Sequence, residues 1–228
     1  MSKCNYIVAA TKPWSIDAYE NFCGDLPNWF LITKKEELTL DLIDKINPRY
    51  IFFPHWNWIV PKDILDKYES VCFHMTDVPY GRGGSPLQNL IVRGHKETQL
   101  TALKMSEHLD AGPVYLKEPL SLHGSAQDIF YRAAFKIMEL IEKISINTPV
   151  PEKQKGDVTT FKRRSPAESE IVEDLNLEQL YDFIRMLDAE TYPKAFLNIK
   201  GYRFEFDKAT LNETGKLEAR VSITGNDK

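Results

Sequence analysis

The sequence predicts an α/β fold: a mostly parallel sheet with helices on both faces, followed by a small C-terminal α+β extension. Through the first eighty residues, short and nearly continuous apolar runs alternate with amphipathic stretches. This alternation is typical of parallel strands joined by crossover helices. Near residue 148 the composition changes, and short strand-like segments follow. The chain therefore divides into a larger sheet domain and a smaller C-terminal region.

The first part of the chain contains four expected strands and three expected helices. The apolar runs predict strands at residues 5–10, 29–32, 49–53 and 70–74. Helical spacing of apolar residues predicts helices that begin at Pro13, cover residues 38–46 and cover residues 61–67. Two of these helices begin with proline, which favours the first helical turn. The carboxyl ends of such strands form the ligand-binding edge of a parallel sheet.

The middle of the chain is expected to complete the sheet. A helix at residues 86–93 precedes two alternating segments, 98–105 and 114–120, which are predicted as antiparallel strands joined by a turn at Asp110. A long amphipathic helix from Ser125 to about residue 144 closes the domain.

The C-terminal part begins with residues 147–164, which have no apolar periodicity and are interpreted as an extended connector. A helix at 177–188 and strands at 195–199, 202–206 and 217–223 follow. We accordingly expect residues 1–148 to form the catalytic domain. Residues 149–228 are expected to form the connector and a small C-terminal region.

Composition narrows the functional class. The 228 residues carry a formal net charge of −4, which gives no overall attraction for a polyanion, so no nucleic-acid partner is expected. No apolar run is long enough to cross a bilayer, and no signal-peptide segment is seen, so a cytoplasmic protein without a membrane partner is expected. The three cysteines, Cys4, Cys23 and Cys72, have no metal-ligand spacing, so no metal is expected.

His74 and Asp110 are the strongest candidates for chemistry. His74 ends a predicted strand, where its side chain faces the ligand edge, and an imidazole exchanges protons near neutral pH. Asp110 precedes Gly112 in a tight turn that holds its carboxylate in place. A carboxylate that orients an imidazole is a common partner in acid–base sites. Each residue also has a structural interpretation, as a packed histidine and as a turn cap.

Four further residues are candidates for contacts with a substrate. Gly83 and Gly84 give the loop after His74 the freedom to approach a ligand closely, although glycines alone also describe a flexible turn. Arg82 in the same loop and Lys12 after the first strand are candidate substrate contacts. A solvated Arg82 is the alternative.

The order of these motifs resembles the folate-dependent formyltransferases. The strand ends at His74 and is followed by the loop Pro79-Tyr80-Gly81-Arg82-Gly83-Gly84-Ser85-Pro86 and by the turn Leu109-Asp110-Ala111-Gly112. The resemblance covers about residues 5–125 and continues in Phe161-Lys162-Arg163-Arg164-Ser165-Pro166 and in Tyr192-Pro193-Lys194-Ala195-Phe196. It implies a Rossmann-like domain, N10-formyltetrahydrofolate as formyl donor, and an Asn, His and Asp trio whose last two members match His74 and Asp110.

The resemblance also implies the folate-binding residues. Trp58, Ile59 and Val60 match positions that line the pterin pocket, and Ser106 and Glu107 match positions whose backbone contacts the pterin, next to Asp110. The alternative for the tryptophan-rich loop is simple packing under the edge of the sheet.

One position departs from the family pattern. The family asparagine lies two residues before the histidine, and this sequence has Cys72 there. A thiol is a weak hydrogen-bond donor and a poor substitute for an amide that stabilises an oxyanion. Asn57 follows the neighbouring predicted strand and is the candidate replacement; the alternative is an asparagine that caps a surface turn. Cys72 itself is interpreted as packing rather than as a nucleophile.

The formyl acceptor is expected to be the primary amine of a nucleotide-linked amino sugar. The strings Phe53-Pro54-His55-Trp56 and Phe73-His74-Met75-Thr76-Asp77 resemble sugar N-formyltransferases of pseudaminic-acid-type pathways, whose acceptor is a UDP-linked 4-amino-4,6-dideoxy sugar. Two alternatives remain: an aminoacyl group, bound to a carrier protein or as methionyl-tRNA, and a non-catalytic folate- or sugar-binding module. Small-molecule partners are expected, and a homodimer is left open.

Overall fold

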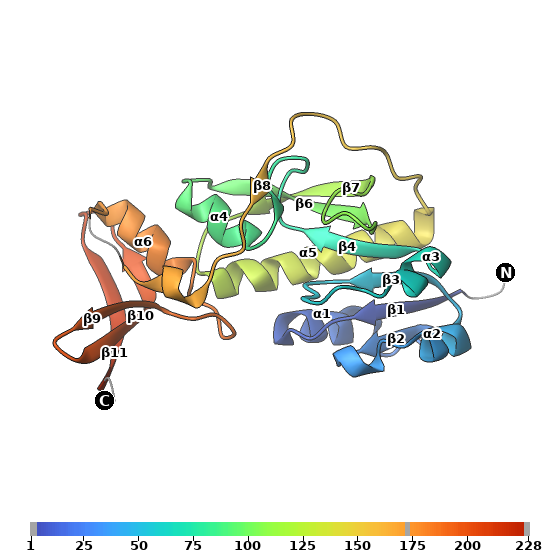
Figure 1. Cartoon of the computed structure of the whole chain (residues 1–228), viewed down its shortest axis with the longest axis horizontal. Coiled ribbons are helices and arrows are strands. Elements are labelled where there is room, and N and C mark those ends of the chain that lie inside the picture. The colour runs from blue at the N-terminus through green and yellow to red at the C-terminus, as the bar shows by residue number, and fades with distance from the viewer. Residues whose placement is uncertain (1–3, 172–173, 226–228) are drawn as a thin grey trace. The chain divides into compact units, whose positions relative to one another are not determined.

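The main sheet contains six strands in the order β2-β1-β3-β4-β6-β7 (Figure 1). The computed structural model describes residues 4–171 and 174–225. The strands are β1 (Asn5–Ala9), β2 (Trp29–Ile32), β3 (Pro48–Phe53), β4 (Ser70–His74), β6 (Glu97–Lys104) and β7 (Val114–Ser121). β1 pairs in parallel with β2 and β3, β3 pairs in parallel with β4, and β6 runs antiparallel to β4. This arrangement confirms the mostly parallel sheet that the apolar runs predict.

Helices alternate with most of these strands along the chain. They are α1 (Pro13–Cys23), α2 (Leu40–Ile46), α3 (Lys62–Lys67), α4 (Pro86–Val92) and α5 (Ala126–Asn147). The Thr39 hydroxyl accepts a hydrogen bond from the Leu42 N–H, so α2 begins later than residue 38. Among the described residues, no helix is both long and apolar enough to cross a membrane.

The sheet buries side chains on both faces, as parallel strands with covering helices require. On one face, Ile7, Ile51 and Phe53 belong to an apolar cluster that also contains Val60 and Ile64. On the other face, aromatic rings of β1, β2 and β3 stack, with the centroids of Tyr6 and Trp29 4.6 Å apart and those of Trp29 and Phe52 6.2 Å apart. The alternation of side chains along each strand assigns neighbouring residues to opposite faces.

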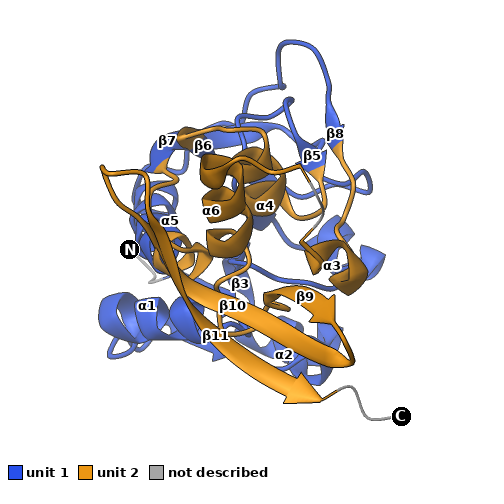
Figure 2. Cartoon of the chain, turned by 90° about the vertical axis from the view of Figure 1, so that its left-hand side faces the viewer, with its two compact units in different colours: residues 1–82, 99–120, 131–160 blue, residues 83–98, 121–130, 161–228 orange. Residues whose placement is uncertain are grey.

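The described chain forms two compact units that interleave in sequence (Figure 2). The first contains residues 1–82, 99–120 and 131–160, and the second contains residues 83–98, 121–130 and 161–228. The predicted boundary between a catalytic domain (residues 1–148) and a C-terminal region (residues 149–228) stays a prediction.

The second unit contains the predicted C-terminal α+β region. α6 (Leu177–Arg185) accompanies an antiparallel sheet of β9 (Ala195–Ile199), β10 (Tyr202–Leu211) and β11 (Leu217–Gly225), in the order β11-β10-β9. The Asn176 side chain accepts from the Gln179 N–H and caps the start of α6. The helix is shorter than the predicted 177–188.

The segment predicted as a plain connector is in fact part of the structure around it. Glu152 forms an antiparallel bridge with Val114, and β8 (Thr160–Phe161) pairs with β5 (Arg82–Gly83) in a two-stranded sheet. These pairs are too short to produce a periodic apolar pattern, which explains why the sequence did not indicate them.

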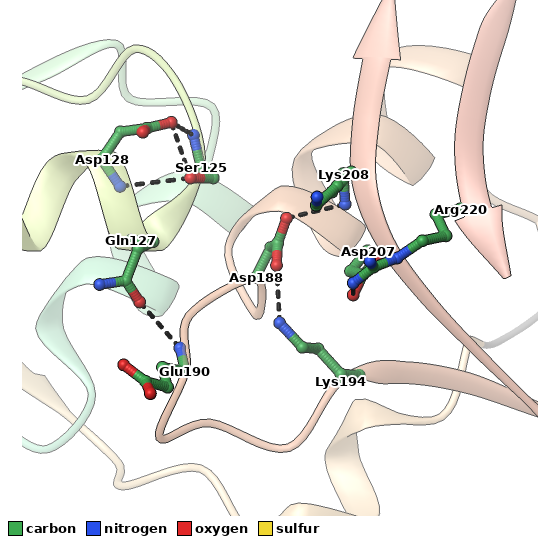
Figure 3. A network of polar contacts seen from close by, with 9 residues as sticks. All are labelled: Ser125, Gln127, Asp128, Asp188, Glu190, Lys194, Asp207, Lys208 and Arg220. Atoms are coloured by element: carbon green, nitrogen blue, oxygen red, sulfur yellow. Dashed lines mark hydrogen bonds and ion pairs between the residues drawn. The ribbon is translucent and has the colours of Figure 1, made fainter. Parts of the chain in front are cut away.

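Asp188 is the centre of a polar network in the second unit (Figure 3). Its carboxylate accepts from Lys194 Nζ at 2.6 Å and from the Lys208 N–H at 2.8 Å, and its carbonyl oxygen accepts from the Gln127 N–H at 2.9 Å. The carboxylate therefore joins the loop after α6 to β10.

Replacing Asp188 with alanine should destabilise the protein by about 1.5–3 kcal/mol, the range for losing hydrogen bonds to a charged group. The free energy of unfolding in urea, followed by circular dichroism, measures this. Glu190→Ala is the matched control, because the Glu190 side chain is exposed and its contact with Gln127 uses only its backbone N–H. Equal stability of the two variants would show that the Asp188 network carries no net stabilisation.

Candidate active site

His74 is the last residue of β4 and lies at the ligand edge of the sheet. Its side chain is only 8% exposed, its Nε2 is 2.8 Å from the carbonyl oxygen of Gly81, and its Nδ1 is 3.5 Å from Oδ2 of Asp110. A carbonyl oxygen only accepts hydrogen bonds, so Nε2 is the donor in the first contact. An imidazolium would satisfy both neighbours at once. The structure thus brings together the two residues that the sequence singled out for acid–base chemistry.

The Asp110 carboxylate is held by the tight turn between β6 and β7. Asp110 has a left-handed backbone (φ 52°) and a side chain that is 10% exposed. A Cβ on Gly112 would lie 1.7 Å from the carbonyl oxygen of Lys104, so only glycine fits there. The Lys104 N–H donates to the carbonyl oxygen of Pro113 at 2.9 Å and closes the hairpin. The close approach of Gly112 to the Lys104 carbonyl therefore explains why the tight turn expected from sequence needs a glycine.

The loop after His74 is held by Thr159, a residue that the sequence did not indicate. The Gly81 N–H donates to Thr159 Oγ1 at 2.7 Å, and the Arg82 N–H donates to the carbonyl oxygen of Thr159 at 3.0 Å. The Gly81 carbonyl is therefore fixed where it accepts from His74. A contact between residues 78 positions apart leaves no signal in a single sequence.

The glycines of this loop differ in their surroundings. Gly83 has a φ of 105°, which favours glycine. A Cβ on Gly84 would lie 2.4 Å from the Cβ of Arg163, and the Gly84 N–H donates to the carbonyl oxygen of Phe161 at 3.1 Å. Gly84 is thus required for close packing against another backbone segment. Ligand contacts of Gly83 and Gly84 stay predictions.

Cys72 has the properties of a packed thiol. It packs against the apolar cluster that contains Phe53 and Val60. Burial raises the pKa of the Cys72 thiol, and the nearby Asp110 carboxylate raises it further. The sulfur therefore stays protonated at neutral pH, which supports the interpretation of Cys72 as packing.

Asn57 lies in the loop after β3 and is exposed. Phe53 at the end of β3 pairs with Cys72, so both strands do run to the same edge. Within residues 4–171 and 174–225 the Asn57 side chain makes no hydrogen bond, and the structure does not place it in contact with His74. Its role as an amide donor stays a prediction.

The predicted folate residues lie in two loops of the first unit. Ile59 is 95% exposed, Val60 is buried, and the Trp58 ring lies edge-on to Trp56 with centroids 5.0 Å apart. In the second loop, Ser106 Oγ donates to the carbonyl oxygen of His108 at 3.1 Å. The two loops are joined by an ion pair between Lys62, at the start of α3, and Glu107. Two of the predicted folate segments are therefore neighbours.

Lys12 lies next to a different group, the neutral imidazole of His55. The Trp14 indole N–H donates to His55 Nδ1 at 3.2 Å. Burial, and to a smaller extent the nearby Lys12 ammonium, lower the pKa of His55 to about 4. His55 is therefore neutral at pH 7 and is not a second imidazolium for catalysis. Contact of Lys12 with a substrate stays a prediction.

Comparisons with known proteins show which proteins this chain is similar to. The model of a family described as the methionyl-tRNA formyltransferase C-terminal domain matches residues 166–224. A solved methionyl-tRNA formyltransferase from Clostridium thermocellum is 46% identical, with a TM-score of 0.94 over 98% of this chain and 100% of that one. A methionyl-tRNA formyltransferase of Rickettsia canadensis is 32% identical over 142 residues, 60% of this chain and 47% of that protein. The chain spans about half the length of the first curated relatives it matches.

More distant solved structures share the fold alone. HypX from Aquifex aeolicus in complex with tetrahydrofolic acid is 16% identical, with a TM-score of 0.72 over 94% of this chain and 40% of that one. A 4-N formyltransferase from Francisella tularensis is 16% identical with a TM-score of 0.68, and a sugar N-formyltransferase from a Shewanella species is 13% identical with a TM-score of 0.66. Both matches cover 95% of this chain and 96% of the other.

The burial of the thiols gives a test of the Cys72 interpretation. A thiol reacts with iodoacetamide as the thiolate, so the raised pKa values of Cys72 and of Cys23, about 11 for the latter, should keep both unmodified at pH 8 in the folded protein. Exposed Cys4 should be modified first. Mass spectrometry of peptides after timed alkylation measures this, with the urea-unfolded protein as control. Fast modification of Cys72 in the folded state would contradict the packed thiol.

Proposed function

The chain belongs to the formyltransferase family, and from that premise we propose that it transfers a formyl group from N10-formyltetrahydrofolate to the α-amino group of methionyl-tRNA. The observation that carries the formyl-transfer part is the position of His74 between the Asp110 carboxylate and the Gly81 carbonyl. The acceptor part rests on the relative that is 46% identical over nearly the full length of both chains.

The residues of the site have distinct roles in this reaction. Attack of an amine on a formyl carbon develops negative charge on the formyl oxygen and leaves the amine with a proton to lose. A protonated His74 would share its Nε2–H between the Gly81 carbonyl and the developing oxyanion. When the tetrahedral species collapses, the bond between the formyl carbon and N10 breaks, and the proton that the amine loses would pass by way of the Asp110 carboxylate to the departing N10. Asp110 would hold the imidazole in orientation and stabilise its cation. Asn57 remains our proposed amide donor to the same oxygen.

The loop after β3 that contains Trp56 and Trp58 offers a hydrogen-bond donor and an apolar surface, both of which suit a pterin ring. N10-formyltetrahydrofolate, which the family uses, supplies the formyl group. The Trp56 indole N–H is buried and has no hydrogen-bond partner among the described residues, and exposed Ile59 offers an apolar surface three residues away. An unpaired buried donor is costly unless a ligand accepts from it. We therefore assign folate binding to this loop together with Ser106, Glu107 and the Asp110 turn.

The proposed acceptor is the alternative that the sequence left open, and it differs from the leading expectation. The nucleotide-linked amino sugar rested on two short strings, whereas the sugar N-formyltransferases match at no more than 16% identity, which supports the fold alone. The relatives with 32% and 46% identity are methionyl-tRNA formyltransferases. They favour the aminoacyl alternative, and they also count against the expected absence of a nucleic-acid partner.

The charge of the chain limits how a tRNA could be bound. Residues 150–228 contain 13 Lys and Arg against 15 Asp and Glu, a balance of −2. Neutralised phosphates supply most of the non-specific affinity for nucleic acids, with a salt slope of about −0.9 per contact on a duplex. We therefore expect this protein to contact few phosphates and to recognise mainly the aminoacyl end.

His74→Ala and Asp110→Asn should each lower formyl-transfer turnover by about 100-fold or more, in line with the loss of an acid–base group. Steady-state rates with N10-formyltetrahydrofolate measure this, and circular dichroism checks folding. His123→Ala, which removes an exposed histidine of the second unit, is the control and should retain wild-type turnover. Near-wild-type rates for either site variant would place the chemistry elsewhere.

The acceptor is tested by offering methionyl-tRNA, a UDP-linked 4-amino sugar and an aminoacyl carrier protein with N10-formyltetrahydrofolate, and by detecting formyl addition by mass. We expect addition to methionyl-tRNA, with binding that weakens only slightly between 50 and 200 mM salt, because few phosphates are neutralised. Addition to the sugar and not to the tRNA would overturn the proposed acceptor. A steep salt dependence would overturn recognition of the aminoacyl end.

A further inference from the structure

Gln154 lies in the segment between α5 and β8 and uses every hydrogen-bonding atom of its amide. Its Nε2 donates to the carbonyl oxygens of Asp110 and Gly112, both at 2.8 Å. Its Oε1 accepts from Nε and Nη2 of Arg82, at 3.1 and 2.8 Å. All four residues belong to the first unit. Because the nitrogen faces carbonyls and the oxygen faces a guanidinium, the orientation of the amide is defined.

The two donated bonds hold the turn that carries the candidate catalytic carboxylate. The carbonyls of Asp110 and Gly112 flank Ala111 in the chain, so the Gln154 nitrogen holds this turn by two hydrogen bonds. Gly112 lies so close to the Lys104 carbonyl that a Cβ on it would be 1.7 Å from that oxygen. The left-handed backbone of Asp110 is one that non-glycine residues adopt only when their surroundings hold them there. The hydrogen bond from Gln154 to the Asp110 carbonyl is one of the contacts that keep this backbone conformation in place.

The accepted bonds hold the loop that carries the other partner of His74. Arg82 directly follows Gly81, whose carbonyl oxygen accepts from His74 Nε2. Thr159, five residues after Gln154, receives the Gly81 N–H on its hydroxyl. Residues 152–159, which we name the strap, thus hold both acceptors that face the imidazole. The strap itself is anchored by two hydrogen bonds between Glu152 and Val114, at 2.7 and 2.8 Å.

We propose that Gln154 is a positioning residue of this site: its amide couples the Asp110 turn to the Arg82 loop and so sets where His74 stands relative to its two acceptors. This rests on the proposed formyl transfer. Gln154 acts through Asp110 and Arg82 and needs no contact with a substrate.

Glutamine is the side chain this position requires. A glutamate has the same length and would still accept from Arg82, with added charge attraction, but it cannot donate to either carbonyl. Its carboxylate would instead face the oxygens of Asp110 and Gly112. An asparagine keeps the amide and is one methylene too short to span both groups. The two variants therefore separate the loss of the donors from the loss of reach.

The first measurement is steady-state kinetics of Gln154→Glu and Gln154→Asn. Displacement of reacting groups by about 1 Å can cost about 100-fold, so kcat should fall by about that factor. The KM for N10-formyltetrahydrofolate should change by a smaller factor than kcat, because the Asp110 turn is only part of the proposed folate site. Lys155→Ala is the matched control, since Lys155 lies in the same strap and forms only an exposed pair with Glu152, and it should behave as the wild type. An unchanged kcat, or a change in KM alone, overturns the proposal.

The second measurement is amide hydrogen exchange, which does not depend on activity. Loss of two hydrogen bonds of about 1 kcal/mol each should accelerate exchange in residues 104–114 about tenfold or more in Gln154→Glu, and not in Lys155→Ala. A lower kcat without faster exchange there would overturn action through the turn. If the wild type transfers formyl to no acceptor, the proposed function fails, while the exchange result still decides whether Gln154 holds the turn.

Discussion

The buried imidazole of His74 is held between two acceptors, and the rest of the site is arranged to keep those acceptors in place. One is a backbone carbonyl, that of Gly81, and the other is the carboxylate of Asp110 on a left-handed residue. Both lie in loops, where backbone is normally mobile. The sheet delivers His74 to its edge, but it does not fix the loops. The loops are held by the close approach of Gly112 to Lys104 and by hydrogen bonds to the strap.

Much of this arrangement could be predicted from the sequence because it is encoded locally. The apolar run at residues 70–74 and the tight turn at Gly112 indicate His74 and Asp110 as candidate site residues without any knowledge of the fold. The parallel order of β3 and β4 follows from the crossover rule. What the sequence does not contain is the pairing of Gln154 with residues 42–72 positions away. A single glutamine in a segment without periodicity resembles any connector residue.

The sugar acceptor that the sequence leads us to expect lacks support from the comparisons, for a related reason. The strings around Phe53 and His74 lie at the ends of β3 and β4, next to the candidate catalytic residues, so they carry little information about the amine. Acceptor preference depends on surfaces outside these strand ends. A relative that is 46% identical along the whole chain samples those surfaces as well, and it therefore carries more weight than two short motifs.

The thiol at Cys72 leaves the question of which amide faces the oxyanion, and the hydrogen-bond pattern narrows the choice. Both amide protons of Gln154 are directed at the carbonyls of Asp110 and Gly112. The Gly81 and Arg82 N–H groups are directed at Thr159, and the Gly84 N–H is directed at Phe161. If any of these donors turned toward the oxyanion, a hydrogen bond that holds a loop next to His74 would be lost. Asn57 has no such duty among the described residues, so its amide is the one that could turn toward a substrate without cost to the site.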